Sequence, residues 1–227
     1  MFDVDGRTRS RRRFGRFALA LSIWAGAASC APSDVARKPV ITTTQPVATP
    51  REIAGVRNFA WVTKTVSRGA QPTRAGFETL KSMGVKTVID LRGKSHRDEI
   101  DGLDLKYVQV PSSISKPDEQ QFVDFLRLVR DPHNLPVFVH DDAGADRVGL
   151  YVAVYRMVEQ GWTSRDARAE LDRFHFNPFW TQVPTFLDRL DVESLRHQAS
   201  LAPSTRPATT RAATRRSRES RPSSGPT

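Results

Sequence analysis

The sequence contains almost no cysteine: its 227 residues include one, Cys30. A single thiol cannot form an intrachain disulfide, and its position near the N-terminus excludes thiol chemistry from the rest of the chain. Zinc-type Cys/His spacing is absent too, because the five histidines lack the i, i+4 pairing of a metal-binding helix. They are His96, His133, His140, His175 and His197. We therefore expect no metal site and no cofactor.

The central part of the chain has no excess charge of either sign. Residues 51–196 hold 21 basic and 21 acidic residues, whereas the whole chain carries a formal charge of +10. The excess comes mainly from six arginines in residues 1–30 and six in residues 197–227. A basic protein can indicate a nucleic-acid partner. Here the excess lies outside the expected folded domain, so we expect no specific nucleic-acid partner.

A long hydrophobic run is also missing. The apolar stretch of residues 17–28 has about a dozen residues, against the roughly 20 that a membrane-spanning helix needs. It follows an arginine cluster and precedes Cys30, which is the order of a secretory signal, so we predict that residues 1–30 form an export signal. The protein is then expected in the cell envelope or periplasm.

The end of this signal favours lipid anchoring. Residues 27–30 (Ala-Ala-Ser-Cys) resemble a bacterial lipobox, in which Cys30 becomes the lipidated N-terminus and attaches the protein to a membrane. An ordinary cleaved signal with a chance cysteine is the alternative. Residues 10–16 also resemble a twin-arginine signal, so the export route stays open.

Two segments lack the pattern of a folded core. Residues 31–55 are rich in Pro and Thr and are predicted to form a linker, and residues 196–227 are predicted to be a disordered Arg/Ser/Thr/Pro tail. The arginines of the tail can contact anionic polymers of the envelope, although we expect no specific role. The folded domain is therefore predicted over residues 56–195.

Strand and helix patterns alternate in that domain. The helix of residues 148–160 is apolar nearly all round and must be buried. Such alternation predicts a single α/β domain whose central, mostly parallel sheet is flanked by helices, with ligands at the carboxyl ends of the strands. The predicted strands are 58–64, 85–91, 105–110 and 136–140; the predicted helices are one from a Thr73 cap to Gly84, 118–130, 148–160, one capped by Ser164, and 184–190.

Residues 137–149 form the most informative segment: a buried strand, a loop containing Gly144, and the start of a helix. Such a loop presents unpaired backbone N–H groups and the positive end of a helix dipole to an anion, and Arg147 adds a planar fork for two phosphate oxygens. We predict a phosphate-binding loop between strand and buried helix. Its residues are His140, Asp142, Ala143, Gly144, Ala145, Asp146 and Arg147.

The positions of His140, Gly144, Arg147 and Gly149 resemble the active-site loop of cysteine-dependent tyrosine and dual-specificity phosphatases, in which His-Cys is followed after five residues by Arg. Asp141 stands at the nucleophile position. Residues 67–72 and 85–92 also resemble early segments of the atypical bacterial branch. The resemblance implies a phosphatase fold and a phosphorylated protein or other phosphorylated ligand as partner; the oligomeric state stays open.

The resemblance also implies two further catalytic groups. Val148 stands where a Ser or Thr usually follows the arginine, and a general acid is expected from the loop before the site. In residues 111–118 only Asp118 offers a carboxyl group, and Asp118 is equally explained as the cap of the next helix. The candidate catalytic residues are therefore Asp141, Arg147 and Asp118.

Three hypotheses follow for Asp141. Its carboxylate can fold into the loop, accept the N–H groups and pair with Arg147, which predicts a catalytically impaired pseudophosphatase with a weakened phosphate site. It can instead attack phosphorus and form an acyl phosphate, with or without a cation held near Asp142 and Asp146. In the third hypothesis the domain is a non-catalytic scaffold or interaction protein of the envelope.

Overall fold

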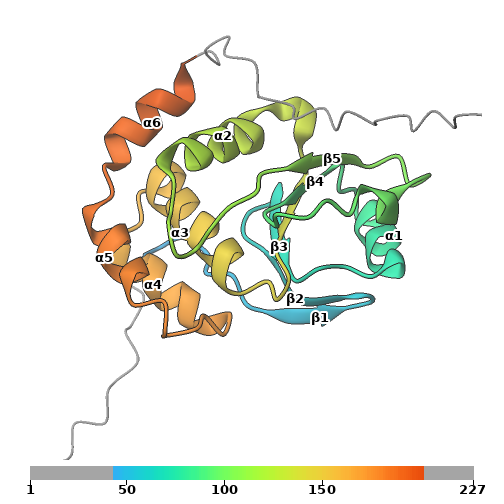
Figure 1. Cartoon of the computed structure of the whole chain (residues 1–227), viewed down its shortest axis with the longest axis horizontal. Helices are drawn as coiled ribbons and strands as arrows, with labels where there is room; N and C mark the ends of the chain where they lie inside the picture. Colours follow the sequence, from blue (N-terminus) through green and yellow to red (C-terminus); the bar gives the residue numbers. More distant parts are fainter. Residues whose placement is uncertain (1–42, 202–227) are drawn as a thin grey trace, which may run out of the picture. The chain divides into compact units, whose positions relative to one another are not determined.

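The computed structural model describes residues 43–201, which form a single domain around one six-stranded sheet (Figure 1). The sheet order is β1-β2-β3-β6-β4-β5. β3, β6, β4 and β5 run parallel, and β1 and β2 are added antiparallel beside β3. This confirms the predicted mostly parallel sheet. The strands are β1 (Arg51–Ile53), β2 (Val56–Trp61), β3 (Val66–Gly69), β4 (Thr87–Asp90), β5 (Lys106–Gln109) and β6 (Val137–His140).

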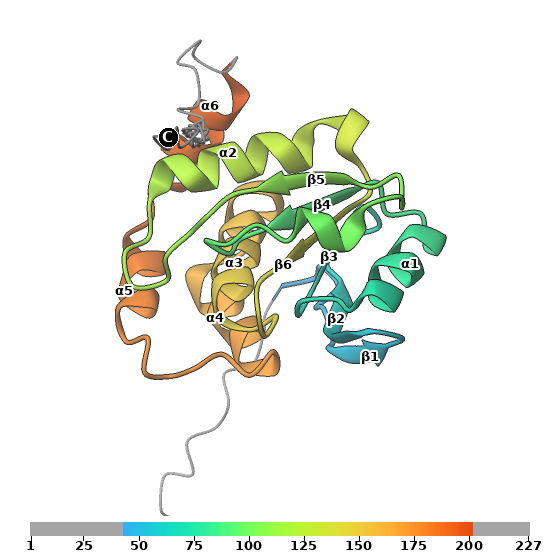
Figure 2. The same cartoon turned by 45° about the vertical axis from the view of Figure 1, so that its right-hand side comes forward.

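Helices cover both faces of the sheet. The helix α1 packs on one face, and α2 to α6 gather on the other (Figure 2). The helices are α1 (Arg74–Ser82), α2 (Glu119–Arg130), α3 (Asp146–Gln160), α4 (Ser164–Arg173), α5 (Gln182–Arg189) and α6 (Val192–Ser200), with short 3₁₀ helices η1 (Arg97–Ile100) and η2 (Pro132–Asn134). No helix in residues 43–201 is both long and apolar enough to cross a membrane.

The central strand β6 is buried on both faces and delivers the predicted loop. Side chains alternate along a strand, so Val137 and Val139 enter the core beneath α2 to α6, whereas Phe138 enters the core beneath α1. His140 follows Phe138 on the α1 side, where its ring stacks on Phe138 at 5.7 Å and meets Phe77 edge-on. Strand β6 thus fixes the start of the loop within the core.

Several predicted boundaries are wrong by a few residues. The sheet begins within the predicted linker, because β1 pairs with β2 through Arg51 opposite Phe59. A helix that was not predicted, α6, reaches Ser200 inside the predicted tail, because its buried residues Leu195 and Ala199 belong to the core shared with α2 and α3. The fourth helix is capped by Thr163, one residue before the predicted cap. Cys30, residues 1–42 of the predicted signal and linker, and the tail from residue 202 lie outside the described residues.

Other signals were correct. Thr73 caps α1 by accepting a hydrogen bond from the Gly76 N–H, and Gly161 ends α3 in the left-handed conformation.

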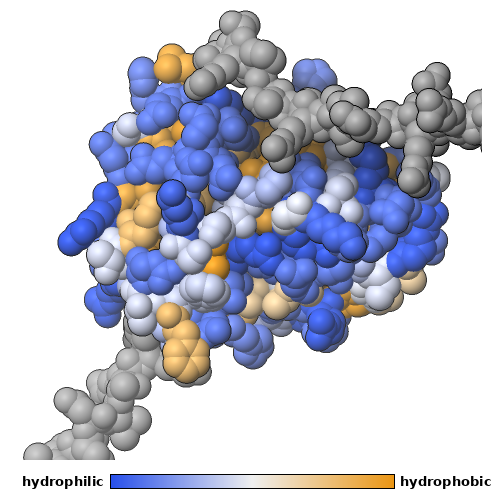
Figure 3. All heavy atoms as spheres, viewed as in Figure 1, coloured by the Kyte–Doolittle hydropathy of each residue, from blue (hydrophilic) through white to orange (hydrophobic). Residues whose placement is uncertain are grey.

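The surface in Figure 3 is mainly hydrophilic, with apolar side chains in small separate areas. Phe179 and Leu201 are the exposed large hydrophobic residues of the described chain, at 87% and 51% exposure.

Candidate functional site

The loop of residues 141–145 joins β6 to α3 at the carboxyl end of the parallel strands, which is where the sheet type predicts a ligand site. Gly144 has a positive φ of 72°. A Cβ atom at this position would lie 2.4 Å from the Ala70 nitrogen and 2.5 Å from the Gly69 carbonyl carbon. Glycine is therefore required for the loop to pass against the end of β3.

The Asp141 side chain occupies this loop from the inside. Asp141 is 2% exposed. Its Oδ1 accepts hydrogen bonds from the N–H groups of Ala143 (3.0 Å) and Gly144 (2.5 Å), and its Oδ2 accepts one from Val148 (3.1 Å). The N-cap residue Ala145 contributes no side-chain cap, so this carboxylate also caps α3. This is the arrangement of N–H groups that the first hypothesis for Asp141 expected.

Arg147, in contrast, does not pair with Asp141, so that part of the hypothesis is wrong. Its guanidinium forms an ion pair with Asp142, whose other carboxylate oxygen lies 3.7 Å from Nη1 of Arg92. Arg147 also approaches the carbonyl of Leu91 at 3.5 Å. The reason is geometric: both oxygens of Asp141 are turned inward to backbone N–H groups, whereas the Asp142 side chain is 69% exposed.

The third carboxylate of the loop has a structural partner of its own. Asp146 accepts hydrogen bonds from the backbone N–H of Asn177 (2.8 Å) and from Nε1 of Trp180 (3.1 Å), which tie the segment after α4 to the start of α3. Asp141, Asp142 and Asp146 therefore face different partners. Within residues 43–201, no group of three or more His, Cys, Asp or Glu side chains is arranged to hold a metal ion.

Two side chains beneath the loop were not singled out from the sequence. Arg68 is fully buried, donates to the carbonyl of Gly144 at 2.8 Å and lies 3.7 Å from the ring centre of Phe174. Burial lowers the pKa of Arg68 to about 10, so it stays charged at neutral pH. Asn58 donates to the carbonyls of Ala143 and Gly144. The resemblance over residues 67–72 was the available signal for Arg68.

His140 is held in a buried polar network that the sequence also did not predict. Its Nε2 lies 4.0 Å from Oδ2 of Asp90, which receives hydrogen bonds from Arg92 (2.9 Å) and Tyr107 (2.5 Å). Burial would raise the pKa of Asp90, but the bond from Arg92, the nearby His140 and the bond from Tyr107 hold it below its ordinary value. Burial lowers the pKa of His140 to about 4, so its imidazole is neutral at pH 7.

A cleft of about 410 Å³ opens over the loop. Asp118 is exposed and does not line it; its Oδ1 accepts from the Gln120 N–H at 3.0 Å, so the structure places it as the cap of α2. Three carboxylates line the cleft beside one arginine, which gives it a negative balance. The lining residues are Ser112, Ser113, Ile114, Ser115, Asp141, Asp142, Ala143, Asp146, Arg147 and Trp180.

This chain is similar in sequence to a protein phosphatase. The dual specificity protein phosphatase TpbA of Pseudomonas aeruginosa is 28% identical over 142 residues in strain UCBPP-PA14 and 26% identical over 160 residues in strain PAO1. The match to the first relative covers 61% of this chain and 65%, just under two thirds, of the relative. The match to the second covers 64% of this chain and 73% of the relative.

Solved structures show the same fold at low sequence identity. P. aeruginosa TpbA superimposes with a TM-score of 0.62 at 23% identity, over 70% of this chain and 99% of that one. The core catalytic domain of the PP-IP phosphatase SIW14 from S. cerevisiae gives 0.59 at 21% identity, over 66% and 94%. A family model described as "DSP-PTPase phosphatase fused to NAD+ Kinase" matches residues 57–186, more than half of the chain. The chain therefore belongs to this family of dual-specificity phosphatase-like domains.

Proposed function

We propose that this domain is a pseudophosphatase, a member of its family that has lost thiol catalysis and whose phosphate cradle, residues 141–147, is filled by its own side chain. One observation carries the proposal: the Asp141 carboxylate accepts three backbone N–H bonds from Ala143, Gly144 and Val148. These donors are the groups with which such a loop would bind phosphate. An internal anion therefore competes with any external one.

The surroundings of Asp141 support the same proposal. A carboxylate whose two oxygens both accept hydrogen bonds is a poor nucleophile, because attack on phosphorus would require it to leave those donors. Val148 is buried and apolar where the family usually carries a hydroxyl group. Asp142 and Asp146 also line the cleft, and each repels every unit of negative charge on a phosphate by about 1 to 4 kcal/mol at a separation of about 4 Å.

The ligand class we propose is a phosphorylated protein or another phosphorylated molecule, bound without turnover. The relative TpbA has been solved in complex with pTyr as a serine variant, which supports a phosphoryl group as the recognised chemistry. We also propose that the protein is exported and held at a membrane through Cys30. In this proposal the domain serves as an envelope binding module.

Turnover is the first test. The full chain is assayed on p-nitrophenyl phosphate with and without Mg²⁺, beside Asp141→Ala. We expect no turnover above background in any sample, because both oxygens of Asp141, which stands at the nucleophile position, accept hydrogen bonds from the loop. Turnover by the parent that disappears in Asp141→Ala would overturn the proposal in favour of a phosphohydrolase that uses Asp141; a requirement for Mg²⁺ would identify the cation-assisted form.

Phosphate affinity is the second test, measured with vanadate as a phosphate analogue. Asp141→Ala frees three N–H donors and removes one negative charge, so we expect vanadate to bind at least about tenfold more tightly than to the parent. This gain should disappear when Arg147→Ala is added. Asp172→Ala removes an exposed carboxylate on α4 and should leave the affinity unchanged. Equal affinity of the parent and Asp141→Ala would contradict the self-occupied cradle.

A further inference from the structure

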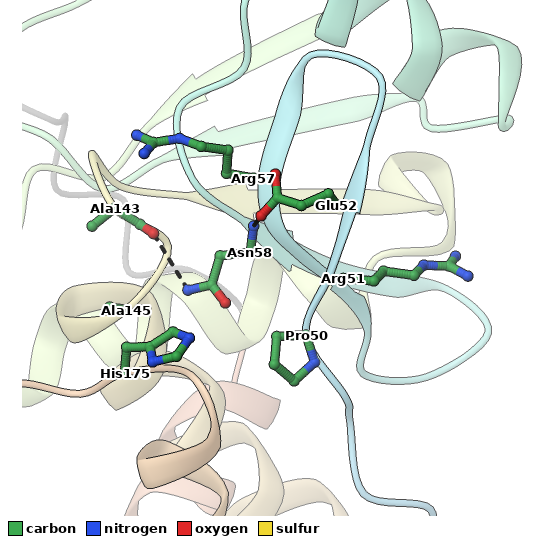
Figure 4. A pocket seen from close by; sticks show the side chains of 8 residues that line it. All are labelled: Pro50, Arg51, Glu52, Arg57, Asn58, Ala143, Ala145 and His175. Carbon is green, nitrogen blue, oxygen red and sulfur yellow. Dashed lines mark hydrogen bonds between the residues drawn. The ribbon is translucent and has the colours of Figure 1, made fainter.

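A second pocket lies on the other side of the loop from the cleft. It has a volume of about 440 Å³ and is lined by residues of β1, β2, the loop and the turn after α4 (Figure 4). We call it the β2 pocket; its polar lining consists of Arg51, Glu52, Arg57, Asn58 and His175. Ala143 lines both this pocket and the cleft, so the loop is the wall between them.

The charges of the two hollows have opposite balance. The cleft is lined by three carboxylates and one arginine, whereas the β2 pocket is lined by two arginines, one histidine and the single carboxylate of Glu52. That carboxylate is engaged, because its Oε1 accepts the Asn58 N–H at 3.2 Å. An anion approaching this side of the domain is therefore favoured in the β2 pocket and opposed in the cleft.

Two polar side chains of the β2 pocket are free to bind a ligand. The side chains of Arg57 and His175 are exposed, and neither forms a hydrogen bond or ion pair with another residue of the described chain. In Figure 4 the Arg57 side chain extends toward Ala143, and the His175 ring lies beside Ala145. A guanidinium fork with no protein partner suits an oxyanion with two accessible oxygens.

The frame of the pocket is fixed by one amide. Nδ2 of Asn58 donates to the carbonyls of Ala143 (3.3 Å), Gly144 (3.0 Å) and Phe174 (3.2 Å), which joins β2, the loop and the end of α4. Asn58 and His175 both hold a positive φ, 53° and 61°, a conformation that non-glycine residues adopt rarely. Both residues line the pocket, whereas Asp104, the third such residue of the described chain, does not.

We propose that the β2 pocket binds a phosphate-bearing small molecule, with Arg57 as its main contact. Its volume lies in the range of small-molecule sites. The proposal goes beyond the pseudophosphatase function and does not depend on it, because Arg57 and Glu52 lie outside the cradle. A domain with a filled cradle would thus still hold an open anion site against the back of the same loop.

Calorimetry of the full chain with inorganic pyrophosphate at low ionic strength tests this site. We expect Arg57→Ala to weaken binding about tenfold, the effect of losing one charge-assisted contact. Arg165→Ala removes an exposed arginine at the opposite end of α4 from His175 and should bind like the parent. Arg147→Ala is measured as well, because its response shows whether pyrophosphate enters the cleft.

A gain of affinity provides the second arm and cannot arise from misfolding. Glu52→Gln removes the only carboxylate among the lining residues and keeps an oxygen for the Asn58 N–H, so we expect pyrophosphate to bind about fivefold more tightly. Binding that is lost in Arg147→Ala but kept in Arg57→Ala would overturn the proposal. Absence of pyrophosphate binding in both the parent and Glu52→Gln would also overturn it. So would a protein that binds vesicles containing phosphatidylglycerol but does not bind pyrophosphate.

Discussion

Two neighbouring aspartates together occupy the groups that would bind an external phosphate. Asp141 takes the backbone N–H donors of the loop, and Asp142 takes the guanidinium of Arg147 and lies near that of Arg92. A phosphate ion entering the cleft must displace both. The buried side chains of Arg68 and His140 contact carbonyl groups of the loop instead. They hold the loop backbone in the conformation that directs its N–H groups toward Asp141.

The buried His140 predicts a pH dependence of stability. Its pKa is about 4 in the folded protein and about 6.5 in an unfolded chain. As the pH falls below 6.5 the unfolded state takes up the proton first, so the stability present above pH 6.5 is lost progressively toward pH 4, by about 3 kcal/mol at most. Urea unfolding at pH 7, 6 and 5 measures this loss.

His140→Asn removes the titrating group, so its free energy of unfolding should change less between pH 7 and 5 than that of the parent. His197→Asn removes an exposed histidine and should keep the parent's slope. A parent and a His140→Asn variant with the same slope would show that His140 is not the group responsible.

At the scale of elements, a buried ion pair joins α3 to α4. The position of α3 matters for the site because Arg147 belongs to its first turn. Arg156 donates to Glu170 through Nε (3.0 Å) and Nη2 (2.6 Å), and both side chains are 2% exposed or less. The Ala48 N–H also donates to Glu170 at 2.8 Å. One carboxylate therefore joins α3, α4 and the segment that precedes β1.

Removing this carboxylate should be costly. Glu170→Ala leaves the buried Arg156 charge without its partner, so we expect a loss of about 3 to 5 kcal/mol in the free energy of unfolding. Glu193→Ala breaks the exposed pair with Arg196 on α6 and should cost about 0 to 1 kcal/mol. Denaturant unfolding compares the two; equal losses would contradict the structural role of the α3–α4 pair.

At the scale of the whole molecule, charge is distributed unevenly along the sequence. Residues 51–196 carry equal numbers of acidic and basic side chains, and the excess positive charge lies mainly in segments at the two ends of the sequence. The fold needs none of that excess. The order of arginines, apolar residues and Cys30 supports the proposal that the N-terminal segment is an export signal with a lipid-attachment site.

Cys30→Ala tests this address. We expect the parent, expressed in a bacterial host, to incorporate labelled palmitate and to sediment with membranes, and Cys30→Ala to lose both properties because the acceptor thiol is gone. Ser29→Ala changes the adjacent residue, keeps the thiol and should behave like the parent. A Cys30→Ala protein that remains membrane-bound would contradict the lipid anchor.

Local patterns were sufficient for most elements. The buried strand of residues 137–140, the apolar helix that follows, the Thr73 cap and the Gly161 stop each depend on neighbours in sequence, and each is present. The short strand β1 was missed because three residues, of which two are exposed, have no local strand signal; only pairing with β2 makes them a strand. The helix α6 was missed as well, since it depends on packing against α2 and α3.

Residue type and spacing were enough to predict the α/β fold class, the loop, and Asp141 at the nucleophile position of the phosphatase resemblance. The pairing of the charges, in contrast, depends on the folded structure. Arg147 meets Asp142 rather than Asp141, and Asp90 meets Arg92 and Tyr107 beside His140. These pairings depend on which side chains are buried and on which backbone N–H groups point toward the same carboxylate. Residues that are neighbours in sequence do not specify either property. The β2 pocket likewise exists only because β1, β2, the loop and the turn after α4 meet in the fold.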